Sequence, residues 1–174
     1  MAKSELTKDI ERSFKNYSPA TAAGIRLNLN RGLVTAFEVP VQNGTTQAGL
    51  IDCVRINECF ERGIEKILIT CYEIKVSKSD FKSKNGHNFV GNLNYYVVPN
   101  EIYNDIKNLV PDNIGVIVYY DGKKPPTKNI LGQYRCSYTG LRSKKESGYR
   151  ELSDDEQKWL LLSAMKRIQR DKSK

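Results

Sequence analysis

The sequence predicts an α/β fold in which helices flank a central mixed β-sheet. The chain has 174 residues, enough for one domain with a sizeable core, and we expect a single domain over residues 1–174. Segments with alternating apolar residues, typical of strands, are interspersed with segments whose apolar residues recur every three or four positions, typical of helices. This order favours helices packed on a sheet.

The first part of the chain predicts one helix followed by three strands. Leu6, Ile10 and Phe14 recur at every fourth position within residues 5–17, which indicates a short amphipathic helix. Residues 20–30 are ambiguous between the two structures. The strands are expected at residues 33–41, at 48–56 and within 64–76, with a hairpin between the first two and a turn at 58–63 before the third.

The middle of the chain alternates helices and strands. Ser77 and Asp80 stand three positions apart, the spacing of an N-cap and an acidic N3 residue, so a helix is expected to begin there. A strand at residues 93–99, a helix at 100–110 and a strand at 114–120 follow. The core of the fold should therefore span about residues 33–120.

Residues 121–174 are expected to form a basic loop followed by a C-terminal helix. The segment 123–150 is rich in Lys, Gly, Ser and Tyr, which indicates a long loop or an irregular hairpin. Ser153 and Glu156 have the spacing of a capping box at the start of the helix. Its apolar stripe should consist of Leu161, Leu162, Met165 and Ile168.

Composition limits the class of protein. No apolar run approaches the roughly 20 residues that span a bilayer, and the first residues lack the apolar core of a signal peptide. We therefore expect a cytoplasmic protein without a membrane partner. The four cysteines include no C-x-x-C pair and there is one histidine, a pattern that disfavours a zinc site.

The charge is concentrated near the C-terminus. The chain carries a net charge of +8, and residues 121–174 alone hold 14 Lys/Arg against 7 Asp/Glu. A basic segment on a nearly neutral body suits a polyanionic partner such as DNA, because neutralising phosphates releases counterions. Solubility alone explains the charge equally well.

The third predicted strand ends in two opposite charges on one face. Because side chains alternate across a strand, Ile67, Ile69, Cys71, Glu73 and Lys75 share a face. That face begins apolar and ends charged. A cross-strand or same-face ion pair at a solvated strand end is an alternative explanation of the two charges, but together with the aspartate of the second strand they favour a functional site.

The second predicted strand places a carboxylate among apolar neighbours. Leu50, Asp52, Val54 and Ile56 should share a face, and burying an unpaired carboxylate is unfavourable without a metal or a cation beside it. If both strands belong to one sheet, Asp52 should approach the two charges of the third strand at the rim. Two carboxylates and an ammonium suit a divalent cation and a phosphate. Alternatively, Asp52 caps a local turn.

These residues resemble a known family. The stretch G-L-I-D-C-V, followed by Y-E-I-K-V, resembles the PD-(D/E)xK nuclease superfamily, which has a restriction-endonuclease-like fold. Within it, E-I-K-V-S-K-S-D-F followed by N-Y-Y-V-V-P is similar to the MmcB-like DNA repair nucleases. The resemblance covers about residues 33–120 and implies an αβββαβ core with an antiparallel meander, a crossing helix and a parallel strand. The chain departs from the pattern in lacking a proline before Asp52.

The resemblance implies a metal-dependent DNA hydrolase, acting in DNA repair or in processing of phage or mobile-element DNA. Asp52 and Glu73 would bind Mg²⁺ or Mn²⁺ together with the backbone carbonyl of Ile74. Lys75 would orient the attacking water or stabilise charge on the phosphate. Glu38 matches an acidic position of the family, with an exposed strand residue as the alternative. Glu11 is a further helix carboxylate that surface placement explains better.

Several residues are expected to contact nucleic acid. Ser77, Lys78 and Lys82 begin a helix beside the predicted site, where amide groups and cations favour phosphate. His87 lies in a loop that follows. The basic region adds four cations interleaved with tyrosines, a pattern that suits phosphate contact with base stacking: Arg135, Arg142, Lys144 and Lys145.

Two other functions remain open from the sequence. One is a nucleic-acid-binding module that keeps the fold without catalysis, although such a module has no need of two carboxylates and a lysine. The other is a small interaction protein whose basic end binds an acidic partner. The sequence does not decide between DNA and RNA, nor between a monomer and a homodimer.

Overall fold

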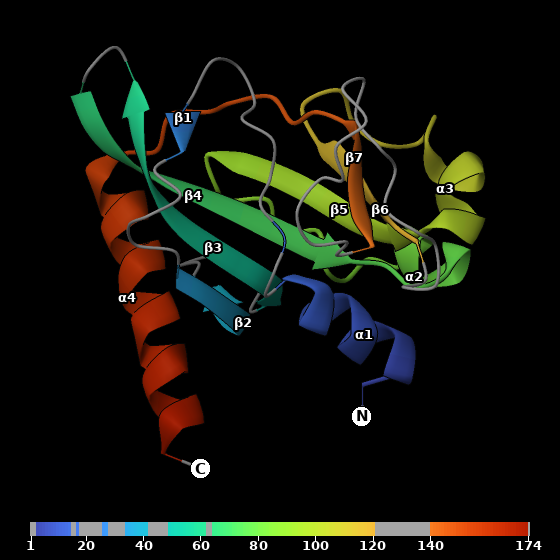
Figure 1. Ribbon diagram of the computed structural model, residues 1–174, viewed down its shortest axis with the longest axis horizontal. Helices are drawn as coiled ribbons and strands as arrows, with labels where there is room; N and C mark the ends of the chain where they lie inside the picture. The colour runs from blue at the N-terminus through green and yellow to red at the C-terminus, as the bar shows by residue number, and fades with distance from the viewer. Residues whose placement is uncertain are drawn as a thin grey trace, which may run out of the picture.

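The computed structural model describes residues 3–14, 17, 26–27, 34–41, 49–61, 64–120 and 140–173. Its elements follow one another along the chain as shown in Figure 1. Their order is α1 (Glu5–Phe14), β1 (Arg26–Leu27), β2 (Val34–Val41), β3 (Gly49–Glu61), β4 (Ile64–Ile74), α2 (Lys78–Lys82), β5 (Leu93–Pro99), α3 (Asn100–Ile106), β6 (Gly115–Tyr119), β7 (Leu141–Lys145) and α4 (Asp154–Lys172).

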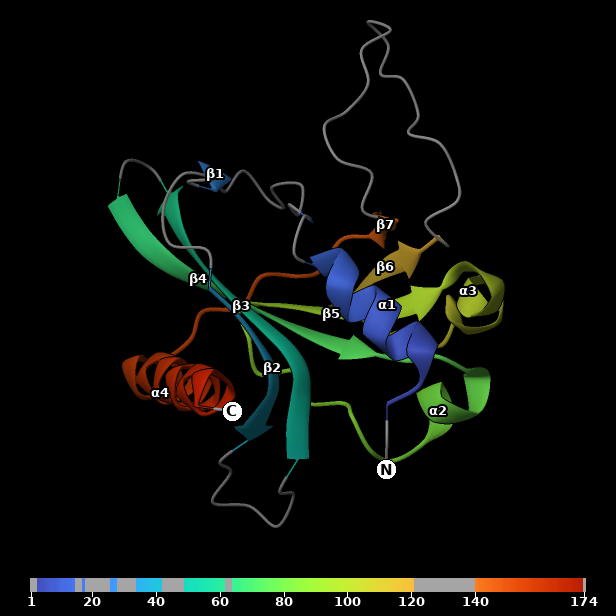
Figure 2. The same cartoon turned by 60° about the horizontal axis from the view of Figure 1, so that its bottom comes forward.

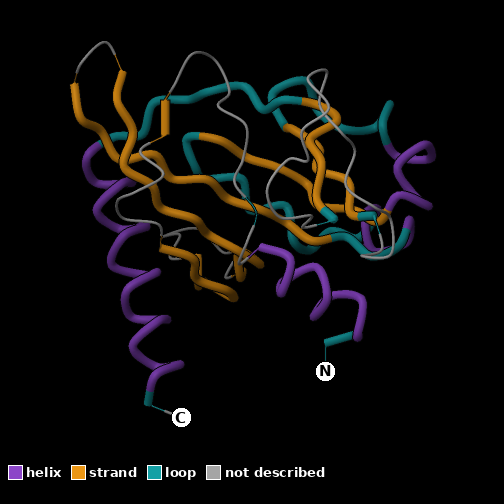
Figure 3. The backbone as a smooth tube through the Cα atoms, viewed as in Figure 1, coloured by secondary structure: helices purple, strands orange, loops and turns teal. Residues whose placement is uncertain are grey.

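The strands form one mixed sheet with the helices around it (Figure 3). Within the described ranges the sheet has seven strands in the order β1-β3-β4-β5-β6-β7, with β2 paired to β3. β2, β3 and β4 are antiparallel neighbours, β4, β5 and β6 are parallel, and β7 returns antiparallel to β6. The predicted α/β fold with a central mixed sheet is thus confirmed. Apart from the two-residue β1, the order from α1 to β5 is αβββαβ.

One face of the sheet is covered by α1, which lies across it in Figure 2. Ile10 and Phe14 of this helix are fully buried. They pack into a core, called the α1-side core below, that also contains Tyr72, Tyr95 and Ile117 from three neighbouring strands. Burial of these side chains removes a large apolar area from water, which fixes α1 on the sheet.

The opposite face is covered in two separate places, at the two ends of the sheet (Figure 1). Leu160 and Ala164 of α4 pack against β2, β3 and β4 in one cluster. Ile106 of α3 and Phe81 of α2 pack against β5 and β6 in another. The alternation predicted for β4 holds, since Ile69 and Cys71 belong to the α4 cluster, whereas Tyr72 and Ile74 belong to the α1-side core.

The helix starts follow the predicted caps. The Ser77 hydroxyl accepts a hydrogen bond from the Asp80 amide at the start of α2. Ser153 and Glu156 form the complete capping box of α4. The predicted helix over residues 100–110 is shorter, because α3 ends at Ile106. In the part of the chain that the structure describes, no helix combines the length and the apolar character needed to cross a membrane.

The predicted apolar stripe of α4 is wrong at two positions. Leu162 and Met165 are 47% and 62% exposed, whereas Leu160, Ser163 and Ala164 are buried. Small residues at 163 and 164 let the helix lie close to β2, and three successive leucines leave its rotation undetermined by pattern alone.

Two connections also differ from the prediction. The turn expected at residues 58–63 is shorter, because β3 continues to Glu61 and β4 begins at Ile64. The segment expected as a loop or irregular hairpin contains β7, paired antiparallel with β6, so the irregular hairpin is the correct alternative for residues 141–145. Arg135 and the remainder of the predicted loop, residues 121–139, lie outside the described residues.

Candidate functional site

The site begins where β3 leaves β4. The last paired residues of this ladder are Cys53 and Tyr72, so the next pair in the same register would be Asp52 and Glu73. At this point a side chain replaces the backbone pairing of the two strands. The Oδ2 of Asp52 accepts a hydrogen bond from the Ile74 amide at 2.8 Å. The carboxylate is therefore held between the two strands, on the row that contains Glu73.

Glu73 is fully buried, on the face between the α4 cluster and the α3 cluster. Its Oε1 accepts a hydrogen bond from the Asn88 amide at 3.2 Å, whereas its Oε2 is buried without a hydrogen-bond partner. Burial and the negative charge of Asp52 raise the pKa of Glu73 to about 8. Burial also raises the pKa of Asp52, against the effect of the Ile74 amide and of Lys75. Such a pair favours a proton or a cation between its members.

Lys75 supplies a positive charge beside both carboxylates. Its side chain is 4% exposed, and its Nζ donates a hydrogen bond to the Asn85 carbonyl at 2.7 Å. The Asp80 carboxylate lies 3.9 Å from the same Nζ. The charge of Lys75 lowers the pKa of both Asp52 and Glu73. The structure thus brings together the two carboxylates and the ammonium that the sequence singled out.

The loop that follows α2 closes over these groups. A Cβ on Gly86 would lie 2.6 Å from Lys75 Nζ and 3.0 Å from Glu73 Oε2, so both polar atoms face this glycine. Asn88 ties the loop down twice, through its amide to Glu73 and through its side-chain Nδ2 to the Leu50 carbonyl at 3.0 Å. Sequence reasoning placed these residues in a loop but assigned them no part in the site; the Asn-Gly pair was the available signal.

Gly86→Ala is therefore expected to disturb the site. Gly86 has φ of +70°, which an L side chain adopts at a penalty of about 1–2 kcal/mol, and the new methyl group would overlap Lys75. We expect a loss of unfolding free energy of about 2 kcal/mol in urea denaturation and, for any activity of this site, a fall of about 100-fold, because small displacements of reacting groups are costly. Gly148→Ala is the matched control, since its Cβ meets only Asn113, at 3.4 Å or more. Equal behaviour of the two variants would contradict the assignment of Gly86.

His87 is exposed, but both of its ring nitrogens are used within the protein. Nδ1 lies 2.6 Å from the Tyr96 hydroxyl and Nε2 lies 2.7 Å from the Ser83 carbonyl. Because a carbonyl only accepts, Nε2 carries the proton and Nδ1 of the neutral ring accepts from Tyr96. Tyr96 is the β5 residue paired with Glu73, and burial, together with the charge of Glu73, raises the pKa of Tyr96 to about 12. In this arrangement His87 contacts Tyr96, the strand neighbour of Glu73, and has no ring nitrogen left for a phosphate.

Glu38 lies on the other side of Asp52. It falls opposite Asp52 in the register of β2 and β3, and it is the one non-glycine residue of the described chain with positive φ, at 51°. Its carboxylate is bound by Lys3 at 2.9 Å and by Arg167 of α4 at 2.8 Å. Lys3 also contacts Glu11 at 2.5 Å. Glu38 and Glu11 therefore both bind Lys3, which lies next to Asp52. Nothing in the sequence pattern marked Lys3 or Arg167 as a partner of these acids.

The conformation of Glu38 coincides with a break in strand alternation, which corrects the predicted face of β3. Ile51 and Val54 both pack in the α4 cluster, whereas Leu50 is 50% exposed. The predicted shared face of Leu50, Asp52, Val54 and Ile56 is therefore correct for the residues after Asp52 and wrong for Leu50. Because Glu38 has a left-handed conformation, the paired strands β2 and β3 bend at this residue. Side chains before and after it therefore do not alternate strictly between the two faces of the sheet.

The predicted nucleic-acid contacts fall into two groups. Beside the site, the Ser77 hydroxyl is occupied by helix capping, Lys78 pairs with Asp105 at 3.3 Å, and Lys82 is exposed. On β7, the Arg142 guanidinium and the Lys144 ammonium lie 5.4 and 5.7 Å from the centroid of the Tyr120 ring, and Lys145 donates to the carbonyls of residues 110 and 111.

The β7 group is separate from the carboxylates. Lys145 pairs with Val116, which pairs with Tyr96, which pairs with Glu73, so three strand spacings of roughly 4.8 Å lie between Lys145 and Glu73. The cations of β7 therefore flank the site at about 14 Å rather than take part in it. Arg135 lies outside the described residues.

The donor set fits a hard divalent cation. Glu73 Oε2 is buried without a partner, and Asp52 supplies a second carboxylate on the same row. Because the N–H and C=O of one strand residue point to the same side, the Ile74 carbonyl faces the side from which Asp52 approaches its amide. Oxygen ligands of this kind suit Mg²⁺ or Mn²⁺. Within the described residues, no cluster of three or more His, Cys, Asp or Glu side chains forms a metal site.

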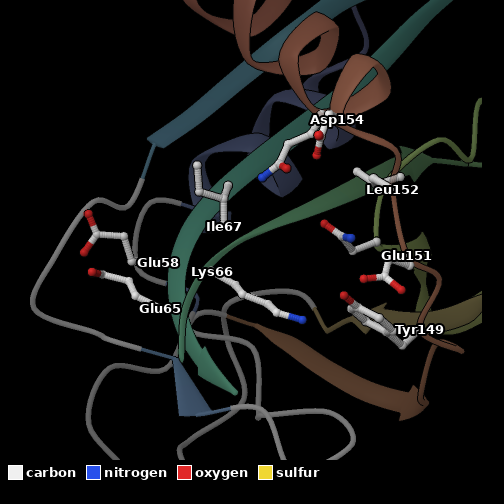
Figure 4. A pocket seen from close by; sticks show the side chains of 10 residues that line it. Glu58, Glu65, Lys66, Ile67, Tyr149, Glu151, Leu152 and Asp154 are labelled. Atoms are coloured by element: carbon white, nitrogen blue, oxygen red, sulfur yellow. The ribbon is translucent and has the colours of Figure 1, made fainter. Parts of the chain in front are cut away.

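A separate pocket lies at the far end of the β3–β4 pair (Figure 4). It has a volume of about 520 Å³ and a polar lining with several acids, among them Glu58, Glu65, Glu151 and Asp154. Ile67 on its wall is six residues from Glu73 along β4, about 20 Å. The pocket therefore shares no residue with the carboxylate site.

Comparisons with known proteins identify the fold but no function. No protein-family model matches the chain, and no curated protein matches it. Among solved structures, the chain is similar to a protein of unknown function from Silicibacter pomeroyi, with a TM-score of 0.53 and 16% sequence identity. The similarity covers 80% of this chain and 77% of that protein. At this level of identity the likeness extends to the fold alone.

Proposed function

We propose that the chain is a metal-dependent nuclease that hydrolyses DNA phosphodiester bonds. The observation that carries the proposal is the buried, unpartnered Oε2 of Glu73, with Asp52 on the same row and Lys75 beside both. A buried carboxylate next to a partly buried one is unfavourable unless a proton or a cation lies between them, and the open side of Asp52 leaves room for a cation. A structural ion pair alone would not require a second acid at the same place.

The residues have distinct tasks in such a reaction. Asp52, Glu73 and the Ile74 carbonyl would hold the cation, and the Ile74 amide orients Asp52 for it. When bound, Mg²⁺ or Mn²⁺ supplies Lewis-acid polarisation of a phosphoryl oxygen and makes a water molecule more acidic. Lys75 keeps a fixed positive charge where negative charge grows on the phosphate. The bond to Asn85 and the lack of space at Gly86 hold this ammonium in position.

Access and charge support a polyanionic substrate. Asp52 is only partly buried, so the site reaches the surface on its side, whereas Glu73 and Lys75 lie beneath the loop at residues 85–88. Arg142 and Lys144 on β7 add positive charge beside Tyr120, and Lys82 is exposed at the end of α2. Cations next to an aromatic ring suit a nucleic-acid strand. DNA is proposed as the substrate, with RNA as a comparison in the test.

The proposal predicts cleavage that depends on a divalent cation. Single-stranded, duplex, nicked and branched DNA of one sequence, and the matching RNA, are incubated with the protein in Mn²⁺, Mg²⁺ or EDTA. We expect at least one DNA form to be cut in Mn²⁺ or Mg²⁺ and none in EDTA, because in the proposed reaction the bound cation polarises the phosphate and activates the attacking water. Gel electrophoresis of end-labelled strands measures the products.

A parallel preparation of Asp52→Asn controls for contaminating nucleases. Cleavage that persists equally in this variant belongs to a contaminant and counts against the proposal. Cleavage of RNA but not of DNA would replace the proposed substrate while keeping the site. Absence of cleavage in all combinations would contradict the enzymatic proposal.

A second candidate is a nucleic-acid-binding module of the same fold without catalysis. It is favoured by the burial of Lys75, which is 3% exposed and bonded to Asn85 within the protein. Such a module would bind DNA with an affinity that falls steeply with salt, since phosphate contacts release counterions. It would show this binding in the absence of any cleavage and with equal strength in Asp52→Asn.

A further inference from the structure

A buried arginine lies on the opposite face of the sheet from the carboxylate site. Arg55 of β3 shares the side-chain direction of Cys53, which belongs to the α1-side core. It is 1% exposed and is the largest fully buried side chain among the residues that the structure describes. Its partner in β4 is Thr70, and this pair lies further along the β3–β4 ladder than the position of Asp52 and Glu73. The proposed nuclease site therefore leaves Arg55 unexplained.

The guanidinium of Arg55 is only partly bonded. Nη1 donates to the Tyr17 carbonyl, and the Tyr17 ring centroid lies 6.0 Å from the guanidinium carbon. Nε and Nη2 are both buried without a hydrogen-bond partner. Among the residues that the structure describes, no carboxylate forms an ion pair with Arg55. A buried charge without a counter-charge is strongly unfavourable, which points to an anion from outside the described chain.

A second unpartnered donor lies next to this arginine. The Tyr72 hydroxyl is also buried without a hydrogen-bond partner, and its side chain is fully buried. Because Cys53 pairs with Tyr72 and Arg55 pairs with Thr70, Tyr72 is the diagonal neighbour of Arg55 on the same face, with about 7–8 Å between their Cα atoms. Long side chains on diagonal neighbours are within reach of each other, so a guanidinium and a phenol in these positions can donate to one small group between them.

The geometry points to a buried site for a small oxyanion, held by Arg55 and Tyr72. Nε and Nη2 form one edge of the guanidinium, and this edge binds two oxygens of a carboxylate or a phosphate in parallel. The Tyr72 hydroxyl donates a third hydrogen bond. Phe14 and Tyr95, with ring centroids 4.8 and 5.8 Å from that of Tyr72, exclude water around the pair. A carboxylate or phosphate in this place satisfies all three donors and the charge.

The test compares the wild-type protein with Arg55→Met and Tyr72→Phe. Each is refolded from denaturant in acetate, in inorganic phosphate or in chloride at equal ionic strength, because a buried site exchanges slowly. We expect acetate or phosphate to raise the wild-type melting temperature by about 5 °C in a saturable manner. Arg55→Met should show no such rise, and Tyr72→Phe should need about tenfold more anion, since one charged hydrogen bond is lost.

Arg12→Met is the matched control, because Arg12 is an exposed arginine of α1 with a side chain 62% exposed. It should respond to the anions as the wild type does. An equal rise in all four proteins is a general salt effect and overturns the site, and so does the absence of any rise. A higher melting temperature of Arg55→Met than of wild type at saturating anion also overturns it. If Arg55→Met does not fold, the comparison of Tyr72→Phe with wild type decides.

Discussion

Asp52→Asn is expected to lower metal-supported cleavage of DNA by about 1,000-fold, the upper end of the effect of removing one group that stabilises transition-state charge. The asparagine side chain has the same shape, and its oxygen can still accept the hydrogen bond from the Ile74 amide that the Asp52 carboxylate accepts at 2.8 Å. Only the charge is lost. Because Glu73 then no longer faces a second carboxylate, the variant should be at least as stable as the wild type.

Asp80→Asn provides the matched control for this experiment. Asp80 also accepts a hydrogen bond from a backbone amide, that of Val76 just after β4, at 3.0 Å, and it also lies near Lys75, with 3.9 Å between carboxylate and ammonium. Asp80→Asn thus makes the same chemical change as Asp52→Asn, at a second carboxylate near Lys75. We expect Asp80→Asn to retain most of the activity. Initial rates at saturating Mn²⁺, with melting temperatures of both variants, distinguish the two; equal losses would remove the special role of Asp52.

Periodicity predicted most of the sheet, and its failures have identifiable causes. Strands β4 and β5 lie in the middle of the sheet and read as continuous apolar runs, so their positions were evident. The bounds of strand β7 were not predictable because Leu141–Lys145 is mostly charged and half-exposed, and pairing with β6 rather than an apolar pattern makes it a strand. The rotation of α4 depends on small residues that fit against β2, which a count of leucines does not reveal.

The carboxylate site was partly predictable for a related reason. Alternation along β4 placed Glu73 and Lys75 on one face, and the apolar context of Asp52 marked it as unusual. The surrounding contacts were not predictable, because they join distant segments. Lys3 and Arg167 meet at Glu38 from the two ends of the chain. The positive φ of Glu38 breaks the alternation that the prediction relied on, and no local pattern announces it.

The pH dependence of stability gives a test of the buried pair that requires no substrate. The pKa of Glu73 in the folded protein is raised to about 8 by burial and by the charge of Asp52, whereas an unfolded glutamate has a pKa of about 4.3. The folded state therefore binds more protons than the unfolded state between these two values. Stability must then fall as the pH rises through this window.

Glu73→Gln is expected to remove this loss. In urea denaturation with EDTA, its unfolding free energy should match that of the wild type near pH 5 and exceed it by ~3 kcal/mol near pH 8, scaled from 1.36 kcal/mol per pKa unit. Glu101→Gln, on the exposed surface of α3, is the control and should follow the wild type. Parallel pH profiles for wild type and Glu73→Gln would show that Glu73 is ordinarily ionised in the fold, and the argument for a cation between the two carboxylates would lose its basis. A rise in wild-type stability at pH 8 on adding Mn²⁺, absent in Glu73→Gln, would instead show that the cation replaces the proton.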